Sequence, residues 1–123
     1  MRSQFTSEEI AYLTDQPRLG RLATADEAGR PQVTPVGMWS LVPETGYVEV
    51  RGRDLDRTRK FRNVSRNPQA ALVVDDIASG PGWNPRAVMI EGPAEALLDD
   101  GNGGGPVIRI RPDRIRSWGL GSG

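Results

Sequence analysis

The sequence predicts a mainly β protein, in which six antiparallel strands and two short helices form a small closed or half-closed barrel. Segments that alternate apolar and polar residues, such as Tyr47–Arg51 and Val107–Arg111, are separated by short turns rich in Gly, Pro and Asp. Helical patterns occur only twice, so the regular strand–helix–strand alternation of a parallel sheet is missing. Only 37% of the 123 residues are apolar, and a curled sheet needs few side chains to fill its interior.

The chain begins with a helix signal. Thr6-Ser7-Glu8-Glu9 has the pattern of a capping box, with Thr6 as the N-cap and Glu9 three residues later. A short helix is therefore expected to run to about Asp15 and to stop before Pro17.

The first half of the predicted sheet is a meander. Strands are expected over Leu19–Ala25, Pro31–Ser40 and Tyr47–Arg51, with turns at residues 26–29 and 43–46. A helix is expected over Asp54–Arg66, because this stretch lacks alternation and has no internal Gly or Pro. Asp54 or Asp56 would be its N-cap.

The second half continues the β pattern. Ala70–Val74 is strongly apolar, which predicts a central strand, and further strands are expected over Arg86–Leu97 and Val107–Arg111. A Gly/Pro loop at residues 77–85 and a flexible Gly-rich turn at residues 99–106 connect them. The segment Arg114–Leu120 closes the chain. Residues 1–123 are expected to form a single domain.

Composition excludes several classes of function. The chain has neither Cys nor His, so neither the usual zinc site nor a Ser-His or Cys-His nucleophile pair is available. Its acidic residues are scattered, so we expect no metal site. Zero net charge argues against nucleic-acid binding, and no apolar run approaches the 18 residues or so of a membrane span. The N-terminus lacks a signal-peptide stretch, so a cytoplasmic location is expected. An enzyme of this composition would rely on a cofactor for its chemistry.

One segment concentrates positive charge. Residues 56–66 hold four Arg and Lys60, the only lysine of the chain, against a single acid, Asp56. Free N–H groups and the helix dipole make a helix N-terminus a ready anion site, and Thr58, Arg59 and Lys60 crowd the first turn of the expected helix. Arg51 and Arg53 extend this basic segment. The alternative is a solvated basic face that pairs with Asp54, Asp56 or Asp75.

The chain resembles the pyridoxamine-phosphate-oxidase-like split-barrel family, and within it the actinobacterial branch that uses the deazaflavin coenzyme F420. The matching stretches occur in the family's order along most of the chain: Leu19–Thr24, Gly29–Val36, Thr58–Val64, Asn67-Pro68, Ala71–Asp76 and Arg114–Gly119.

The resemblance implies a six-stranded antiparallel split β-barrel that forms a homodimer with two cofactor sites at the subunit interface. The family's phosphate-binding basic residue falls on Lys60, beside Thr58 and Arg59. The first barrel strands would line the flavin-like ring with Arg21, Gln32, Val33, Thr34, Pro35 and Val36. The partner subunit would contribute Trp83 and Trp118.

Several of these residues have a structural alternative. Trp83 either stacks on a ring or anchors its loop to the barrel, and Trp118 and Trp39 also fit core or interface positions. Arg21 faces either an anionic group or water. Gln32 either bonds a ring edge or is solvated.

The expected function is therefore a reductase that transfers hydride from reduced F420 to an unsaturated organic substrate, conceivably a polycyclic one. The same barrel accepts FMN, which is the alternative cofactor. The second hypothesis is a non-enzymatic carrier of flavin, deazaflavin or haem, although haem commonly requires a His ligand. No His or Cys is present to protonate a substrate, which leaves water, Tyr12, Tyr47 or Asp76.

Overall fold

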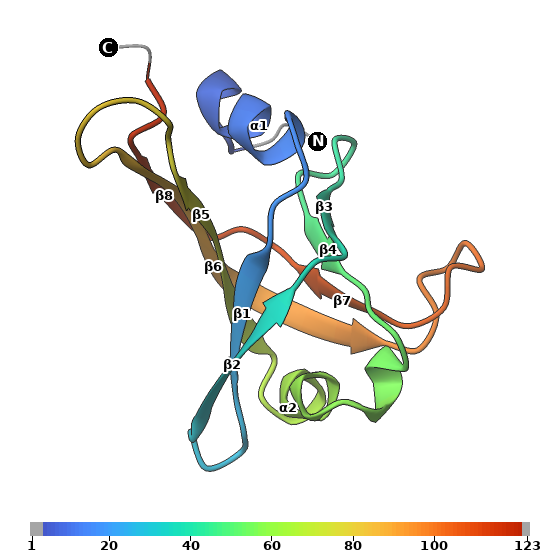
Figure 1. The fold of residues 1–123 in the computed structure, drawn as a ribbon. Coiled ribbons are helices and arrows are strands. Elements are labelled where there is room, and N and C mark those ends of the chain that lie inside the picture. Colours follow the sequence, from blue (N-terminus) through green and yellow to red (C-terminus); the bar gives the residue numbers. More distant parts are fainter. Residues whose placement is uncertain (1–3, 122–123) are drawn as a thin grey trace.

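A computed structural model of the chain describes residues 4–121, and its strands form one antiparallel sheet that curls into half a barrel (Figure 1). Residues 1–3, part of the N-terminal stretch in which no signal peptide is expected, lie outside the described residues. In chain order the elements are α1 (Ser7–Thr14), β1 (Gly20–Ala25), β2 (Pro31–Val36), β3 (Trp39–Leu41), β4 (Val48–Val50), the 3-10 turn η1 (Leu55–Arg57), α2 (Arg59–Arg66), β5 (Gln69–Ile77), β6 (Pro85–Leu97), β7 (Val107–Ile110) and β8 (Arg114–Trp118).

The sheet has eight strands in the order β2-β1-β5-β6-β7-β4-β3, and β8 pairs with β6 beside this path. Within the part of the chain that the structure describes, the two end strands β2 and β3 pair only with β1 and β4. The sheet therefore stays open between β2 and β3. The predicted mainly β, antiparallel, half-closed architecture is confirmed, whereas the expected number of six strands is wrong.

The additional strands arise at two places. The strand expected over Pro31–Ser40 is divided into β2 and β3, because β2 joins one end of the strand order and β3 the other, and the chain must turn at Gly37 and Met38. The closing segment Arg114–Leu120 forms β8, which ends at Trp118. The central strand expected over Ala70–Val74 is confirmed in position, between β1 and β6, and extends over Gln69–Ile77.

The helix expected over Asp54–Arg66 is also divided. Leu55–Arg57 form only a 3-10 turn, and Thr58 has an extended backbone that separates it from α2. Asp54 has a positive φ of 49° and makes no capping bond with its side chain, so neither Asp54 nor Asp56 is the N-cap of α2. Thr58 takes that role, since its hydroxyl accepts a hydrogen bond from the N–H of Phe61 at 3.3 Å.

The expected capping box of α1 is confirmed. The N–H of Glu9 donates to Oγ1 of Thr6 at 3.1 Å, and the N–H of Thr6 donates to Oε1 of Glu9 at 2.9 Å. The hydroxyl of Ser117 in β8 also donates to the Glu9 carboxylate at 2.5 Å, which explains why this acidic side chain lies buried.

Strand β6 is shared by two parts of the sheet, one with β5 and β8 and the other with β7. Its first part, up to Glu91, pairs with both β5 and β8, and from Ala94 onward it pairs with β7. The change occurs at Gly92, where a Cβ atom would lie only 2.0 Å from the carbonyl oxygen of Arg111. A side chain at this position would block the close approach that lets β6 change neighbours.

The concave face of the sheet holds the core. Its completely buried side chains are aliphatic and come from every part of the chain; the largest are Leu22, Leu55, Leu72, Ile90, Ile108 and Ile110. The convex face of β2-β1-β5-β6-β8, which we call the outer face, carries partly or fully exposed side chains, some of them charged. Cross-strand partners lie on the same face of a sheet, and the register places Val33, Ala23, Ala71, Glu91 and Arg114 side by side there.

Helix α2 is fastened to β1 by a buried hydrogen bond. Asn63 is only 4% exposed, and its Nδ2 donates to Oγ1 of Thr24 at 3.0 Å. Phe61 and Val64 bury the apolar side of the same helix. The bond fixes both the rotation of α2 and the direction of its N-terminus.

We expect Thr24→Val to lower the free energy of unfolding by about 1–3 kcal/mol, because the buried Asn63 amide loses its partner. Thr24→Ser, which keeps the hydroxyl, should cost clearly less. Urea unfolding followed by circular dichroism measures both variants. Equal stability of Thr24→Val and the parent protein would show that the bond contributes nothing.

Candidate cofactor site

The N-terminus of α2 carries an unneutralised positive charge. The first N–H groups of a helix have no hydrogen-bond acceptor within the helix. In α2, Arg59 and Lys60 are the first two residues after the N-cap Thr58. Lys60 is half-buried and makes no ion pair with any residue in 4–121. The other cationic side chains of the segment, except Arg66, are exposed and likewise make no ion pair within the described chain; they are Arg53, Arg57, Arg59 and Arg62.

The carboxylates proposed to neutralise this segment do not do so. Asp75 instead pairs with Arg21 on the outer face, and Asp54 and Asp56 form no ion pair within the described chain. Only Arg66, in the last turn, meets a carboxylate, that of Glu27 at 3.4 Å. Apart from Arg66, the cationic side chains of the segment are therefore not neutralised by acids of the described chain, as both an anion-binding site and a solvated basic face would require.

Strand β2 supplies polar groups without partners next to this helix. Thr24, which holds Asn63 of α2, lies directly opposite Gln32 in the β1–β2 ladder. Oε1 of Gln32 and Oγ1 of Thr34 are buried, yet neither atom has a hydrogen-bond partner among the described residues. Buried polar atoms of this kind cost about 1–3 kcal/mol each, so a ligand that supplied a donor or acceptor here would be favoured.

The predicted ring-lining segment Gln32–Val36 is divided between the two faces of β2. Gln32 and Thr34 point to the same side as buried Val36, which belongs to the core. Val33 and Pro35 are exposed on the outer face, where Val33 is 66% accessible. Within one chain, this segment offers a ligand the side chains of Gln32 and Thr34 together with the free edge of β2.

Two predicted cationic residues, Arg21 and Arg51, already have acidic partners, and that of Arg21 is Asp75. Arg51 pairs with Asp100 at 2.7 Å and with Glu49 at 3.2 Å, and its guanidinium also donates to the carbonyl of Gly104. Asp100 accepts the N–H groups of Asn102 and Gly104, which with Arg51 lower its pKa to about 2. Arg51 thus fastens the Gly-rich turn at residues 99–106 and does not extend the free positive charge of α2.

Trp83 and Trp118 lie far from α2 in the same chain. The loop that holds Trp83 and the end of β8 are at one end of the sheet, and α2 is at the other (Figure 1). Trp83 is 75% exposed and Trp118 is 48% exposed. These residues can reach the α2 site only from a second subunit.

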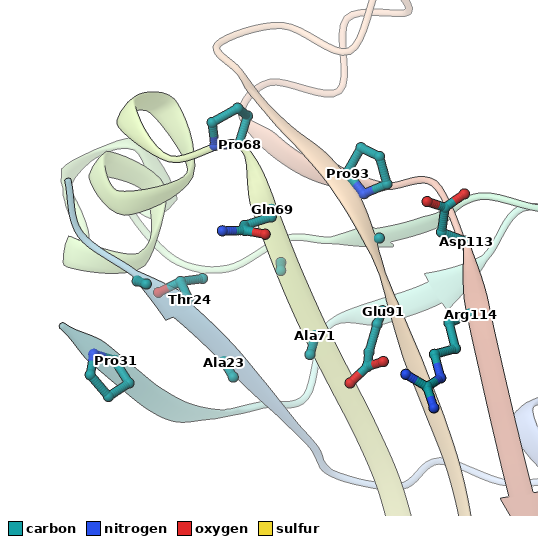
Figure 2. Close-up of a pocket in the computed structure, with 13 residues that line it drawn as sticks. Ala23, Thr24, Pro31, Pro68, Gln69, Ala71, Glu91, Pro93, Asp113 and Arg114 are labelled. Carbon is teal, nitrogen blue, oxygen red and sulfur yellow. The ribbon is translucent and has the colours of Figure 1, made fainter. Parts of the chain in front are cut away.

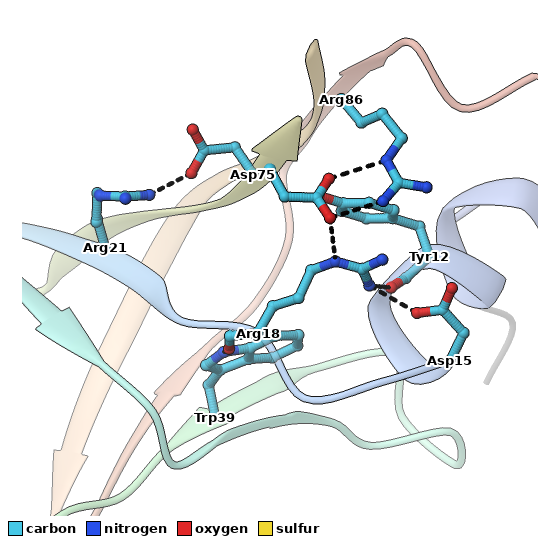
Figure 3. A network of polar contacts seen from close by, with 8 residues as sticks. Tyr12, Asp15, Arg18, Arg21, Trp39, Asp75 and Arg86 are labelled. Atoms are coloured by element: carbon cyan, nitrogen blue, oxygen red, sulfur yellow. Dashed lines mark hydrogen bonds and ion pairs between the residues drawn. The ribbon is translucent and has the colours of Figure 1, made fainter. Parts of the chain in front are cut away.

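A polar network absent from the sequence predictions joins α1 to the sheet (Figure 3). The guanidinium of Arg18, whose side chain is 5% exposed, pairs with Asp76 at 3.1 Å and with Asp15 at 2.6 Å, and lies 3.9 Å above the ring of Tyr12. Arg86 also pairs with Asp76, at 2.6 Å. Nothing in the local sequence distinguishes Arg18 from the exposed arginines, because its partners are brought together only by the fold.

This network argues against two of the candidate proton donors. The Tyr12 hydroxyl donates to Asp76 at 2.9 Å, and burial together with this bond raises its pKa to about 12. Hydrogen bonds from Arg86, Tyr12 and Arg18 lower the pKa of Asp76 to about 2. Near neutral pH Tyr12 holds its proton firmly and Asp76 has none to give, which leaves Tyr47 or water.

A groove of about 690 Å³ lies at the end of the outer face nearest α2 (Figure 2). Small side chains form its floor, including Ala23 and Ala71, and the prolines at positions 31, 68 and 93 border it. Glu91 and Arg114 face each other across the β6–β8 ladder at its edge. The sequence predictions missed this groove, because it depends on which strands become neighbours.

Among residues 4–121, no group of three or more acidic side chains could hold a metal ion. No helix in the described part of the chain is long and apolar enough to cross a membrane.

Comparisons with known proteins agree with this architecture. The model of the pyridoxamine 5'-phosphate oxidase family matches residues 6–119. A 5a,11a-dehydrotetracycline/5a,11a-dehydrooxytetracycline reductase from Streptomyces rimosus is 44% identical over 121 residues, which cover 94% of this chain and 84% of the reductase.

Solved structures resemble the fold at low sequence identity. A conserved hypothetical protein from Mycobacterium tuberculosis has a TM-score of 0.70 and 22% identity, with 97% of this chain and 88% of that protein covered. An FAD-binding protein from Mesorhizobium loti has a TM-score of 0.66 and 20% identity, with 92% and 94% covered.

Proposed function

Because the chain belongs to the pyridoxamine 5'-phosphate oxidase family, we propose that it is a reductase that transfers a hydride from a reduced deazaflavin, F420, to a carbon–carbon double bond of a polycyclic substrate. The observation that carries this proposal is the 44% identity with a reductase of dehydrotetracyclines along 94% of the chain. A substrate of the same class, an unsaturated tetracycline precursor, is the one to test first.

The α2 site fits a cofactor that bears a phosphate. Lys60 and Arg59 would hold the phosphate with the free N–H groups of the first turn, while Gln32 and Thr34 would bond the edge of the ring. Two charged hydrogen bonds of about 1.5–3 kcal/mol each, with one or two backbone bonds, give roughly 4–6 kcal/mol. Micromolar binding needs about 8 kcal/mol, so ring burial must supply the rest.

The charge of the segment supports F420 over FMN. F420 has the longer and more anionic tail, and five cationic side chains between Arg53 and Arg62 have no carboxylate partner among the described residues. FMN remains the alternative, because its phosphate needs only the first turn of α2. When bound, either cofactor supplies the hydride, and the residues of this chain bind and orient it.

The outer face supports a homodimer. Three of the large apolar side chains exposed to solvent, Val33, Ile77 and Trp118, lie on this one face of the sheet. An exposed apolar face of a sheet is typical of a subunit interface. Covering it with a second copy would bring the partner's Trp83 and Trp118 toward the cofactor, as the resemblance to the family implies.

Titration of the purified protein with F420 and with FMN, followed by fluorescence, tests the cofactor. Turnover is then followed with reduced F420 and a dehydrotetracycline, and the product is identified by mass spectrometry. If neither cofactor binds at micromolar concentration, the proposal is wrong. Binding of a cofactor without turnover of any unsaturated acceptor would instead indicate a carrier.

We expect Tyr12→Phe to retain most of the turnover rate at pH 7. A residue that transfers a proton in the reaction contributes about 10²- to 10⁴-fold, whereas the Tyr12 hydroxyl is occupied by Asp76. Tyr47→Phe is the matched comparison. A hundredfold loss of kcat in Tyr12→Phe, with normal binding of the cofactor, would contradict the role assigned to this network.

A further inference from the structure

The Gly-rich turn at residues 99–106, which joins β6 to β7, contains an asparagine followed directly by a glycine. Asn102 and Gly103 are both exposed, and a Cβ atom at Gly103 would have no other atom within 4 Å. The side-chain amide of Asn102 makes no hydrogen bond with any other residue in 4–121. The carbonyl carbon of this amide and the backbone nitrogen of Gly103 are therefore both open to solvent and to each other.

An asparagine in such surroundings can react with its own main chain, and asparagine is among the residues that are chemically labile. The backbone nitrogen of the next residue loses its proton to solvent and attacks the side-chain carbonyl carbon. A five-membered imide ring forms as the new C–N bond is made, and the side-chain nitrogen leaves as ammonia. Water then opens the ring at either carbonyl, which gives aspartate or isoaspartate. The reaction consumes only water.

The other three asparagines of the chain lack these conditions. Asn67 and Asn84 each precede a proline, which has no backbone N–H to lose. Asn63 is 4% exposed within α2, and its amide is engaged by Thr24. Asn102 is therefore the one asparagine of the sequence that combines an exposed amide with a free glycine nitrogen behind it.

Asp100, which also precedes a glycine, is protected from the corresponding ring closure. Its carboxylate accepts the N–H groups of Asn102 at 2.7 Å and Gly104 at 2.9 Å, and Nη2 of Arg51 lies 2.7 Å away. These contacts lower the pKa of Asp100 to about 2. The group therefore stays ionised near neutral pH, and an ionised carboxylate resists attack by a nucleophile. Within this turn, Asn102 is the residue expected to react.

We propose that Asn102 is a site of spontaneous deamidation, and that its isoaspartate product releases the turn from Arg51. The N–H groups of Asn102 and Gly104 both donate to Oδ1 of Asp100. Isoaspartate adds one methylene group to the main chain between these two donors, so they can no longer meet at one oxygen atom. Arg51 binds the turn through Asp100 and the carbonyl of Gly104 at 3.1 Å, and both contacts depend on this geometry.

Peptide mapping of the aged protein tests the modification. The purified chain is incubated at mildly alkaline pH and digested with trypsin, beside a sample that was not aged. The tryptic peptide of residues 87–109 contains Asn102 as its only asparagine and has no glutamine. It should gain the mass difference between an amide and an acid, and should separate into two products of equal mass. The peptide of residues 67–86, with Asn67 and Asn84, is the internal control and should not change.

Loop segments open at little cost in free energy, so the folded protein should react within about tenfold of the rate of a synthetic peptide of residues 98–106. Asn102→Gln is the matched variant: it keeps the backbone N–H that binds Asp100, but its side chain would have to close a larger and less favourable ring. This variant should show no mass gain over the same period. A protein that stays unmodified while the synthetic peptide is converted, or that gains mass equally in residues 67–86, would overturn the proposal.

Hydrogen–deuterium exchange tests the structural consequence. In the isolated isoaspartate form, the amides of residues 99–106 should exchange faster than in Asn102→Gln aged in parallel. Asn102→Asp has the new charge without the longer main chain, so its exchange should stay close to that of the parent protein. Unchanged exchange in the isoaspartate form, or equal acceleration in Asn102→Asp, would contradict release by lengthening of the main chain. No cofactor or substrate takes part, so a failure here is distinct from a failure of the proposed reductase activity.

Discussion

Lys60→Met is expected to weaken binding of the cofactor by about ten- to a hundredfold, which corresponds to the 1.5–3 kcal/mol of one charged hydrogen bond. The folded protein should be equally stable, because Lys60 has no ion-pair partner within the described chain. Methionine keeps most of the side-chain length and removes the charge. Fluorescence titration measures the dissociation constant, and thermal unfolding measures the stability.

Arg62→Met is the matched control. Arg62 lies on the same helix, is exposed and is also without an ion pair among residues 4–121, but it is two residues further from the capped end, about half a helical turn. A diffuse surface charge contributes at most about 1 kcal/mol, so we expect less than about a fivefold loss. Equal losses in both variants would show that the helix acts as a general basic surface and not through a specific contact of Lys60.

Asp76→Ala is expected to cause the largest loss of stability, about 3 kcal/mol, the low end of the range for breaking a buried ion pair, because Arg18 is buried while Asp76 itself is partly exposed. Asp76 joins Arg18, Arg86 and Tyr12, and among the described residues the buried Arg18 would keep Asp15, the Tyr12 carbonyl and the Tyr12 ring as partners. Asp75→Ala, at the neighbouring position, is the control, because its pair with Arg21 is exposed and such pairs contribute about 0–1 kcal/mol. Urea unfolding measures the free energy of unfolding of both variants. Similar losses would show that the network stabilises the fold no more than an exposed ion pair does.

The same network makes stability depend on pH in acid. The pKa of Asp76 is about 2 in the folded protein and near 3.9 in an unfolded chain. Because the folded pKa is the lower one, this contribution is complete above about pH 4 and is lost as the pH falls toward 2. Asp76→Ala should therefore lose less stability than the parent protein over this interval.

Local sequence patterns predicted the elements that depend on neighbours along the chain. The capping box of α1 and the strand between Ala70 and Val74 are of this kind, because caps and alternation act over a few residues. The division of Pro31–Ser40 into β2 and β3 could not be predicted in this way. It follows from pairing with β1 and β4, which lie at opposite ends of the strand order.

The candidate site, too, could be predicted from local sequence only in part. The sequence identified the charge of the Thr58–Lys60 segment, but only the fold shows that no acidic side chain among residues 4–121 pairs with Lys60. Arg51 carries the same charge and lies close in sequence, yet Asp100 engages it from a distant turn. The Gln32 and Thr34 side chains likewise became distinctive only in the fold, where Oε1 of Gln32 and Oγ1 of Thr34 are buried without a hydrogen-bond partner among the described residues.

The shared strand β6 also determines how the molecule opens. Its residues Val88 and Ile90 have no exposed surface and are held between β5 and β8, so their amides should be among the slowest to exchange with deuterium. Strands β7 and β8 follow β6 closely in the chain, whereas β1 must find β5 across a long intervening segment, which favours early formation of the C-terminal half. Strand β2, at the margin of the late-forming half, is then the natural place for brief local opening, beside the proposed cofactor site.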